Sequence, residues 1–129
     1  MKYVWTLDDI EPYEFPEKMG HYGGTGWPLI NAKTVGAETI RVHHSVYPPG
    51  SYTEGHPIHT DREQVYYIVS GTMSLTIGGE HHEVPPGAYV FIPRGIEHNQ
   101  RNDGSEDLVV VTINCPIREG EIVSWPERE

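Results

Sequence analysis

Cysteine and long apolar runs are both scarce in this chain. Its 129 residues include a single cysteine, Cys115, so no disulfide can form within the chain, and this favours a reducing cytoplasm. No apolar run approaches the roughly 18 residues that a membrane-spanning helix needs. Residues 1–9 turn acidic too early for a signal peptide. We therefore expect a cytoplasmic protein, in which Cys115 is an inert, packed thiol at the end of an apolar run.

Basic residues are also few. The chain has 9 Lys and Arg against 19 Asp and Glu, which gives a formal net charge of −10. An acidic surface repels nucleic-acid phosphates and anionic lipids, so we expect no nucleic-acid or membrane partner. The partner that remains is a small molecule.

Helical periodicity is missing as well, since no stretch of ten or more residues repeats its apolar positions at helical spacing. Fourteen glycines and eleven prolines punctuate the chain instead, as is typical of many short strands. The sequence predicts an all-β protein with little or no helix and an irregular loop at residues 20–30. The predicted strands are 3–7, 39–47, 64–70, 72–77, 80–84, 88–92, 108–114 and, as a strand or extended tail, 121–125.

The length fits one domain with its own core. We divide residues 1–129 into an N-terminal arm and loop (1–38), a barrel core (39–114) and a C-terminal strand or tail (115–129). The arm is rich in aromatic residues and could cover an exposed sheet edge of a second subunit, so we expect a homodimer.

Two histidine-bearing segments stand out between residues 50 and 102. The first reads Gly50-x5-His56-Pro57-Ile58-His59-x4-Gln64-x6-Gly71, and the second reads Gly87-x5-Pro93-x-Gly95-x2-His98-x3-Asn102. Imidazole nitrogen and carboxylate or amide oxygen are ligands for divalent metals. Strands of a barrel can bring such side chains together at its mouth. We therefore expect both segments to fold around one ion.

These two segments resemble the paired motifs of the cupin family, the small double-stranded β-helix or jelly-roll barrels. The second segment matches the family's second motif at every position, and the first matches it with one residue extra between His56 and His59. The resemblance implies a small single-domain cupin whose metal ligands are His56, His59, Gln64 and His98. It also implies one divalent transition metal, with iron, manganese, nickel and zinc as the candidates.

Two irregularities leave the ligand set open. Because alternate strand residues face opposite sides, His56 and His59 can both face inward only if a bulge near Pro57 absorbs one residue. Glu63 and Gln64 must also face opposite sides, so only one of them can bind. The spacing to Gly71 in the first motif places the ligand at Gln64, whereas the negative charge of a carboxylate favours Glu63 as the ligand. We prefer Gln64.

Other polar residues are weaker candidates. Tyr66 lies two residues after Gln64 and is expected to face the cavity, as an aromatic wall or as a catalytic acid or base. His43 and His44 are consecutive, so alternation directs one inward and one outward. His21 can reach the site only if its glycine-rich loop caps the barrel. The adjacent pair His81-His82 is expected to be solvated.

The resemblance implies a wide range of functions, and fold alone does not choose among them. Our first hypothesis is a metal-dependent dioxygenase, isomerase or lyase. Its substrate would be a small oxygen-rich molecule such as a sugar acid, a keto or enol compound or a carboxylate. A set of three histidines and one glutamine is similar to that of cupins that open pectin-derived unsaturated uronates. The alternative is a non-catalytic cupin that binds or senses a small, sugar-like molecule.

Overall fold

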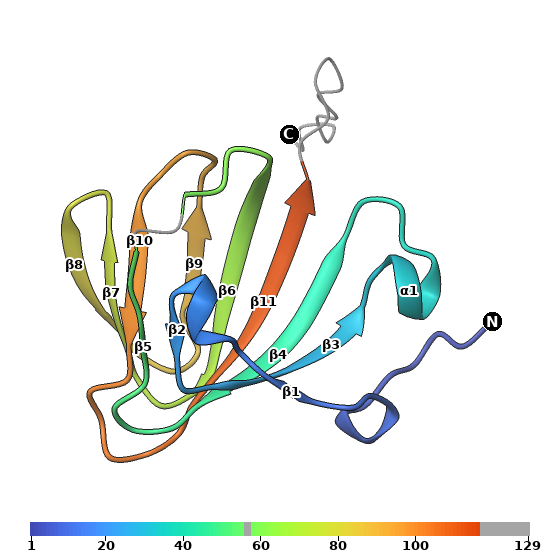
Figure 1. Ribbon diagram of the computed structural model, residues 1–129, viewed down its shortest axis with the longest axis horizontal. Helices are drawn as coiled ribbons and strands as arrows, with labels where there is room; N and C mark the ends of the chain where they lie inside the picture. The colour runs from blue at the N-terminus through green and yellow to red at the C-terminus, as the bar shows by residue number, and fades with distance from the viewer. Residues whose placement is uncertain (56–57, 117–129) are drawn as a thin grey trace, which may run out of the picture.

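Two antiparallel β-sheets face each other in the computed structural model, which describes residues 1–55 and 58–116 (Figure 1). The six-stranded sheet has the order β1-β3-β4-β11-β6-β9, and the five-stranded sheet has the order β2-β5-β10-β7-β8. The strands of the first sheet are β1 (Tyr13–Glu14), β3 (Thr25–Ile30), β4 (Arg41–Tyr47), β11 (Leu108–Pro116), β6 (Arg62–Ser70) and β9 (Tyr89–Ile92). Those of the second are β2 (His21–Tyr22), β5 (Tyr52–Thr53), β10 (His98–Arg101), β7 (Met73–Ile77) and β8 (Glu80–Val84).

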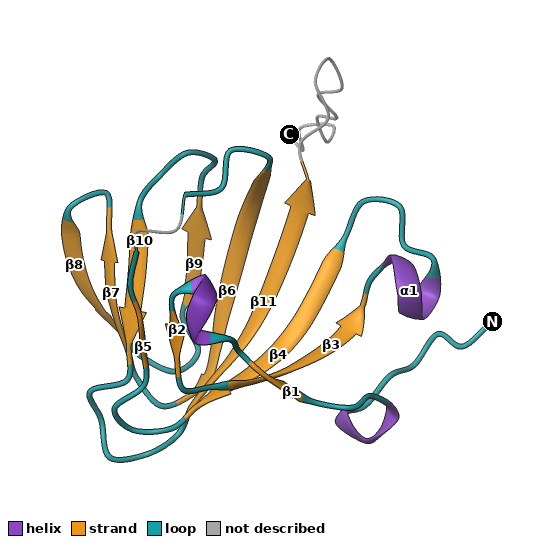
Figure 2. Cartoon of the chain, viewed as in Figure 1, coloured by secondary structure: helices purple, strands orange, loops and turns teal. Residues whose placement is uncertain are grey.

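Within residues 1–55 and 58–116, helix is limited to three short turns, all in the first third of the chain (Figure 2). They are the 3-10 helices η1 (Leu7–Asp9) and η2 (Glu17–Met19) and the α-helix α1 (Ala32–Val35). Asn31 caps α1, because its side-chain oxygen accepts hydrogen bonds from the backbone N–H groups of Lys33 and Thr34. None of the described helices has the length and apolar character to cross a membrane. The prediction of an all-β chain with little helix is confirmed.

Most predicted strands are present, but the N-terminal assignments were wrong. Residues 3–7 form no strand, and Tyr3 and Val4 remain 84% and 77% exposed. Residues 20–30 form β2 and β3 rather than an irregular loop. The glycines that suggested a loop make room for a ring, since a Cβ at Gly26 would lie 2.7 Å from Phe15 Cζ. The sequence also gave no signal for β10, and residues 121–125 lie outside the described residues.

The inner face of the barrel changes from apolar to polar along its strands. On β6, Ile68 is fully buried in the core, while Gln64 is a buried polar residue on the same face, nearer the start of the strand. On β11, Val110 is likewise apolar and Asn114 is polar. Gln64 lies near the start of β6 and Asn114 near the end of β11, and these strand ends are at the side where the ribbons of the two sheets are further apart (Figure 1). The fold therefore has a closed, apolar end and an open, polar end.

Asn102, the last residue of the second motif, is structural. It is 2% exposed, and its Nδ2 donates to the carbonyl oxygens of Tyr47 at 2.7 Å and Glu106 at 2.8 Å. Its Oδ1 accepts from the Gly104 backbone N–H at 3.1 Å. One amide thus satisfies three backbone groups and fixes the turn before β11.

The prediction of a packed Cys115 is wrong. Its side chain is exposed, because the inward positions of β11 are even-numbered near its end and Cys115 faces the other side.

Candidate functional site

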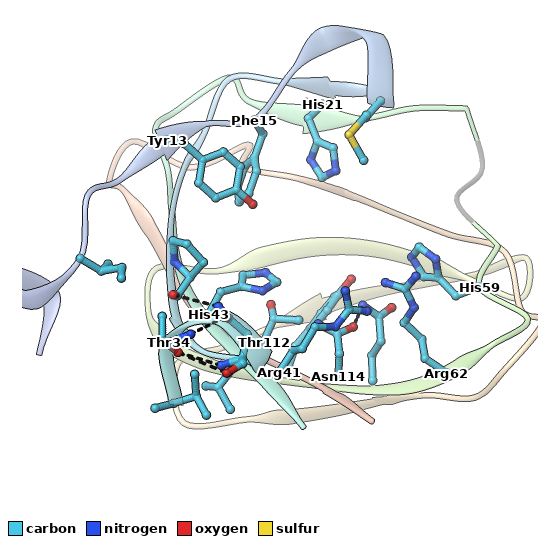
Figure 3. A pocket seen from close by; sticks show the side chains of 18 of the residues that line it. Tyr13, Phe15, His21, Thr34, Arg41, His43, His59, Arg62, Thr112 and Asn114 are labelled. Atoms are coloured by element: carbon cyan, nitrogen blue, oxygen red, sulfur yellow. Dashed lines mark hydrogen bonds between the residues drawn. The ribbon is translucent and has the colours of Figure 1, made fainter. Parts of the chain in front are cut away.

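A pocket of about 980 Å³ opens between the two sheets at their splayed end. Its floor is the six-stranded sheet, and residues of the N-terminal arm and of β2 lie across from that floor (Figure 3). This is the mouth in which the sequence predicted a site.

Two cross-strand rows of side chains form the floor. They follow from the register of β4, β11 and β6, in which residues directly opposite each other share a face. The first row contains Arg41, Asn114 and Gln64, and the second contains His43, Thr112 and Tyr66. Sequence reasoning identified Gln64, Tyr66 and the His43/His44 pair but missed the other members. The signal that would find them is the register of β11 against its two neighbours.

Gln64 has an oxygen that the protein itself does not satisfy. The side chain is 7% exposed, and its Nε2 donates to Asn114 Oδ1 at 2.7 Å. Its Oε1 is buried and has no hydrogen-bond partner in the part of the chain that the structure describes. A buried acceptor without a partner is costly unless a ligand supplies one. Glu63, the alternative to Gln64, is exposed and faces away from the pocket.

His98, at the start of β10, presents a defined nitrogen to the pocket. The residue is 4% exposed, and its Nδ1 lies 3.1 Å from the carbonyl oxygen of Ile96. A carbonyl only accepts, so this contact keeps the proton on Nδ1 and leaves a lone pair on Nε2. Burial lowers the pKa of His98, which favours the neutral, ligating form.

His59 lies beside His98, with 5.6 Å between the ring centroids. The Gly95 backbone N–H donates to the His59 carbonyl at 2.8 Å, so the two motif segments are joined directly. Burial, and then the nearby Arg62 charge, lower the pKa of His59. Its partner in the predicted ligand set, His56, lies outside the described residues, as does Pro57.

The donors fit a divalent metal in kind. Residues 1–55 and 58–116 contain no group of three or more His, Cys, Asp or Glu side chains that could hold an ion. They do contain, on one pocket, two imidazoles whose pKa is lowered and an amide oxygen without a partner. Imidazole nitrogen is a borderline ligand and amide oxygen a hard one, and first-row divalent metals accept both. Metal binding itself stays a prediction.

Tyr66 faces the pocket as expected. It is 8% exposed, and its ring centroid lies 6.4 Å from that of His98. Burial raises the pKa of Tyr66, so the phenol keeps its proton at physiological pH. The hydroxyl can therefore donate a hydrogen bond or a proton, but it is a poor base.

The remaining histidines divide between the pocket and the surface. His21 and His43 line the pocket, and burial lowers the pKa of His43 to about 4. His44 packs edge-on against Trp27 at 5.7 Å on the other face of β4. His81 and His82 are exposed on β8, as predicted.

The family model described as "Cupin domain" matches residues 43–114 of this chain. An uncharacterized protein of Methanocaldococcus jannaschii is 32% identical over 117 residues, which cover 90% of this chain and 89% of that protein. An uncharacterized protein of Streptomyces coelicolor is 36% identical over 55 residues, or 43% of this chain, and the match spans about half (51%) of that relative.

Solved structures share the fold at low sequence identity. A predicted oxalate decarboxylase of Thermotoga maritima superposes with a TM-score of 0.79 at 22% identity, covering 89% of this chain and 100% of that one. The polyketide cyclase RemF of Streptomyces resistomycificus superposes with a TM-score of 0.76 at 24% identity, covering 90% and 80%. These two proteins are named for different chemistries, so the likenesses establish the fold and leave the reaction open.

Proposed function

This chain belongs to the cupin family, and from this premise we propose that it is a metal-dependent enzyme acting on a small, oxygen-rich substrate. His59, His98 and Gln64 would hold one divalent ion at the open end of the barrel, with His56 as a further ligand. The substrate would occupy the adjoining pocket.

The unpartnered Oε1 of Gln64 carries this proposal. A buried glutamine amide that lines the same pocket as two imidazoles is expected to use both of its polar atoms. Only Nε2 is used within the described chain, through Asn114. The Asn114 contact orients the amide in the way that a hydrogen-bond partner orients a metal ligand. The Ile96 carbonyl does the same for His98.

The charges of the pocket favour an anionic substrate. Arg41 and Arg62 both line it, in a chain whose formal net charge is −10. Both guanidinium groups contribute to the lowered pKa of His59, although burial is the larger cause. Arg62 already pairs with Asp61, since its Nε donates to Asp61 Oδ1 at 3.0 Å, and Asp9 and Glu11 also line the pocket. Arg41 is therefore the group that would attract a carboxylate or an enolate. Planar guanidinium groups also suit a carboxylate geometrically.

The residues of this chain would divide the work as follows. The bound ion would supply Lewis-acid polarisation of a carbonyl or carboxylate oxygen. Arg41 would orient the anionic group, and the protonated Tyr66 hydroxyl would donate to a substrate oxygen as negative charge develops on it. The walls of the barrel would limit access of water to these groups.

The alternative is a non-catalytic cupin that binds or senses a small molecule. The protonation states of the floor favour it, since burial holds Tyr66 neutral and lowers the pKa of His43 to about 4. Neither group is therefore a strong general base near neutral pH. Metal-loaded protein that turns over no member of a broad panel of sugar acids and diketones would support this reading.

Elemental analysis of protein purified without chelator tests the metal proposal. Wild type is expected to carry about one equivalent of a first-row metal, and His98→Ala is expected to lose most of it. His81→Ala serves as the control, because His81 is exposed on β8 and pairs with Glu83 at 2.7 Å. A wild-type protein that takes up no iron, manganese, nickel or zinc after soaking would refute the proposal.

A further inference from the structure

The pocket has a second end, built around Phe15. Tyr13, Phe15 and His21 lie on one side of it and face His43 on the floor (Figure 3). The ring centroid of Phe15 is 5.0 Å from that of His21 and 6.3 Å from that of His43. Tyr13 meets Phe15 edge to face at 5.3 Å. None of these residues belongs to the predicted metal set.

The chain is specifically shaped to hold this aromatic wall in place. Phe15 packs partly on the core, where its ring stacks with Tyr47 at 5.8 Å. A Cβ at Gly24 would lie 2.8 Å from Tyr47 Cδ1 and 3.1 Å from Phe15 Cδ2, and one at Gly26 would lie 2.7 Å from Phe15 Cζ. Only glycine at these positions lets the ring sit against β3. Tyr13 still leaves 45% of its surface exposed, so the wall offers apolar area to a ligand.

The two histidines add polar groups to this wall. His21 Nδ1 is buried and has no hydrogen-bond partner in the described part of the chain. Burial lowers the pKa of His21 and of His43, so both rings are neutral near pH 7. A neutral imidazole has one donor and one acceptor, and it suits a hydroxyl or carbonyl group rather than a carboxylate. Of the two arginines on the pocket floor, Arg62 is the one whose charge acts more strongly on His59, whereas Arg41 lies two residues from His43 on β4 and its charge helps to lower the pKa of His43.

We propose that this end of the pocket is a subsite for a flat, hydroxylated, unsaturated ring of the ligand. The ring lies against Tyr13 and Phe15, and its oxygens exchange hydrogen bonds with His21 and His43. This subsite rests on the proposed function, because the metal-binding oxygens of the same substrate would lie at the opposite end of the pocket, near His59 and His98. The volume of about 980 Å³ agrees, because it is near the upper range of ligand pockets and exceeds what a simple dicarboxylate fills.

Binding to chelator-treated protein isolates this subsite from the metal. The probe is naphthoresorcinol, an uncharged dihydroxylated flat ring, and calorimetry compares it with its fully saturated counterpart and with galacturonate. Wild type is expected to bind naphthoresorcinol at least about tenfold more tightly than either comparison ligand. His21→Ala and His43→Ala are each expected to weaken that binding by about two- to tenfold, which is the range for one neutral hydrogen bond. Phe15→Leu keeps an apolar side chain against Gly26 but removes the aromatic ring, and it is expected to weaken naphthoresorcinol binding as well.

His44→Ala is the matched control, because His44 lies on the same strand as His43 and on its opposite face. It should bind naphthoresorcinol as wild type does, and circular dichroism should show the native fold in every variant. Equal binding of the saturated counterpart, or unchanged affinity in both His21→Ala and His43→Ala, would overturn the subsite. That outcome would leave the metal proposal standing, since metal content is measured separately.

Discussion

Gln64 carries no charge, and this sets what a metal at the site would do. With three imidazoles and one amide as ligands, an ion would keep its full double positive charge and bind anionic oxygen strongly. The structure separates the two ligand candidates by face, with Gln64 in the pocket and Glu63 exposed. The position of Gln64 in the pocket agrees with the choice of Gln64 over Glu63, which was made from the motif spacing and not from charge.

Paired alanine variants test that choice. Gln64→Ala is expected to lower metal affinity by about tenfold or more, because ligands and even their supporting partners typically contribute that much. Glu63→Ala is the control and is expected to retain wild-type affinity. Competition with a chromophoric chelator gives both values. A larger loss in Glu63→Ala than in Gln64→Ala would reverse the assignment.

His43 predicts a pH dependence of stability. Burial lowers its pKa from 6.5 to about 4, with the Arg41 charge as the next cause. Between these values the unfolded chain binds more protons than the folded one, so the free energy of unfolding rises with pH across this window. As pH falls from about 6.5 to about 4, the protein is expected to lose on the order of 2 kcal/mol through this residue.

Urea unfolding of wild type and His43→Leu over this pH range measures the effect. The variant should lose less stability on acidification, because it has no ring to protonate in the unfolded state. His81→Leu, at an exposed position, should follow the wild-type curve. Parallel curves for wild type and His43→Leu would show that the imidazole does not contribute.

At the scale of elements, the tight connections between strands limit which side chains are tolerated. Gly71 has φ +78°, and a Cβ there would lie 2.6 Å from the Asp107 carbonyl oxygen. Gly87 has a similar φ of +85°, but a Cβ there would meet nothing within 4 Å. The first glycine follows β6 and the second precedes β9, and both are motif positions.

The two glycines predict unequal costs for one substitution. Gly87→Ala should cost about 1 to 2 kcal/mol, which is the conformational penalty of a left-handed alanine. Gly71→Ala should cost at least about 1 kcal/mol more, because backbone must move to relieve the contact. Chemical denaturation of both variants provides the comparison. Equal costs would mean that the turn after β6 adjusts freely.

For the whole molecule, we expect a homodimer. The N-terminal arm exposes Tyr3 and Val4, and the edge strand β9 exposes 74% of Tyr89 and 57% of Phe91. An exposed edge with large apolar side chains is a surface that a second copy can cover by isologous pairing.

Sedimentation at micromolar concentration should therefore give twice the monomer mass. Phe91→Glu places a charge on the outer face of β9 and should shift the protein toward monomer, whereas Glu80→Gln on β8 should not. A wild-type monomer at these concentrations would end the idea. The division of the chain into arm, barrel core and tail stays a prediction, as does a cytoplasmic location.

The sequence by itself determined the fold class and the inward positions of several residues that line the pocket. Alternation and Gly-Pro punctuation depend on neighbours along the chain, so strands such as β6, β7 and β11 and the inward position of Tyr66 could be read directly. The spacing around Gly95 likewise predicted where His98 would lie.

Only the tertiary structure decided which residues of neighbouring strands lie opposite each other. One row joins Gln64 to Arg41 through Asn114, and the other joins Tyr66 to His43 through Thr112. Both depend on strand register between segments that are about 50 residues (β6 and β11) and about 70 residues (β4 and β11) apart in the sequence. Gly26 lies in β3 and not in a loop, with its Cα side packed against the Phe15 ring. Cys115 lies on the outer face of β11 and is exposed. Local patterns carry no information about such long-range pairings, because register is set by packing across the barrel.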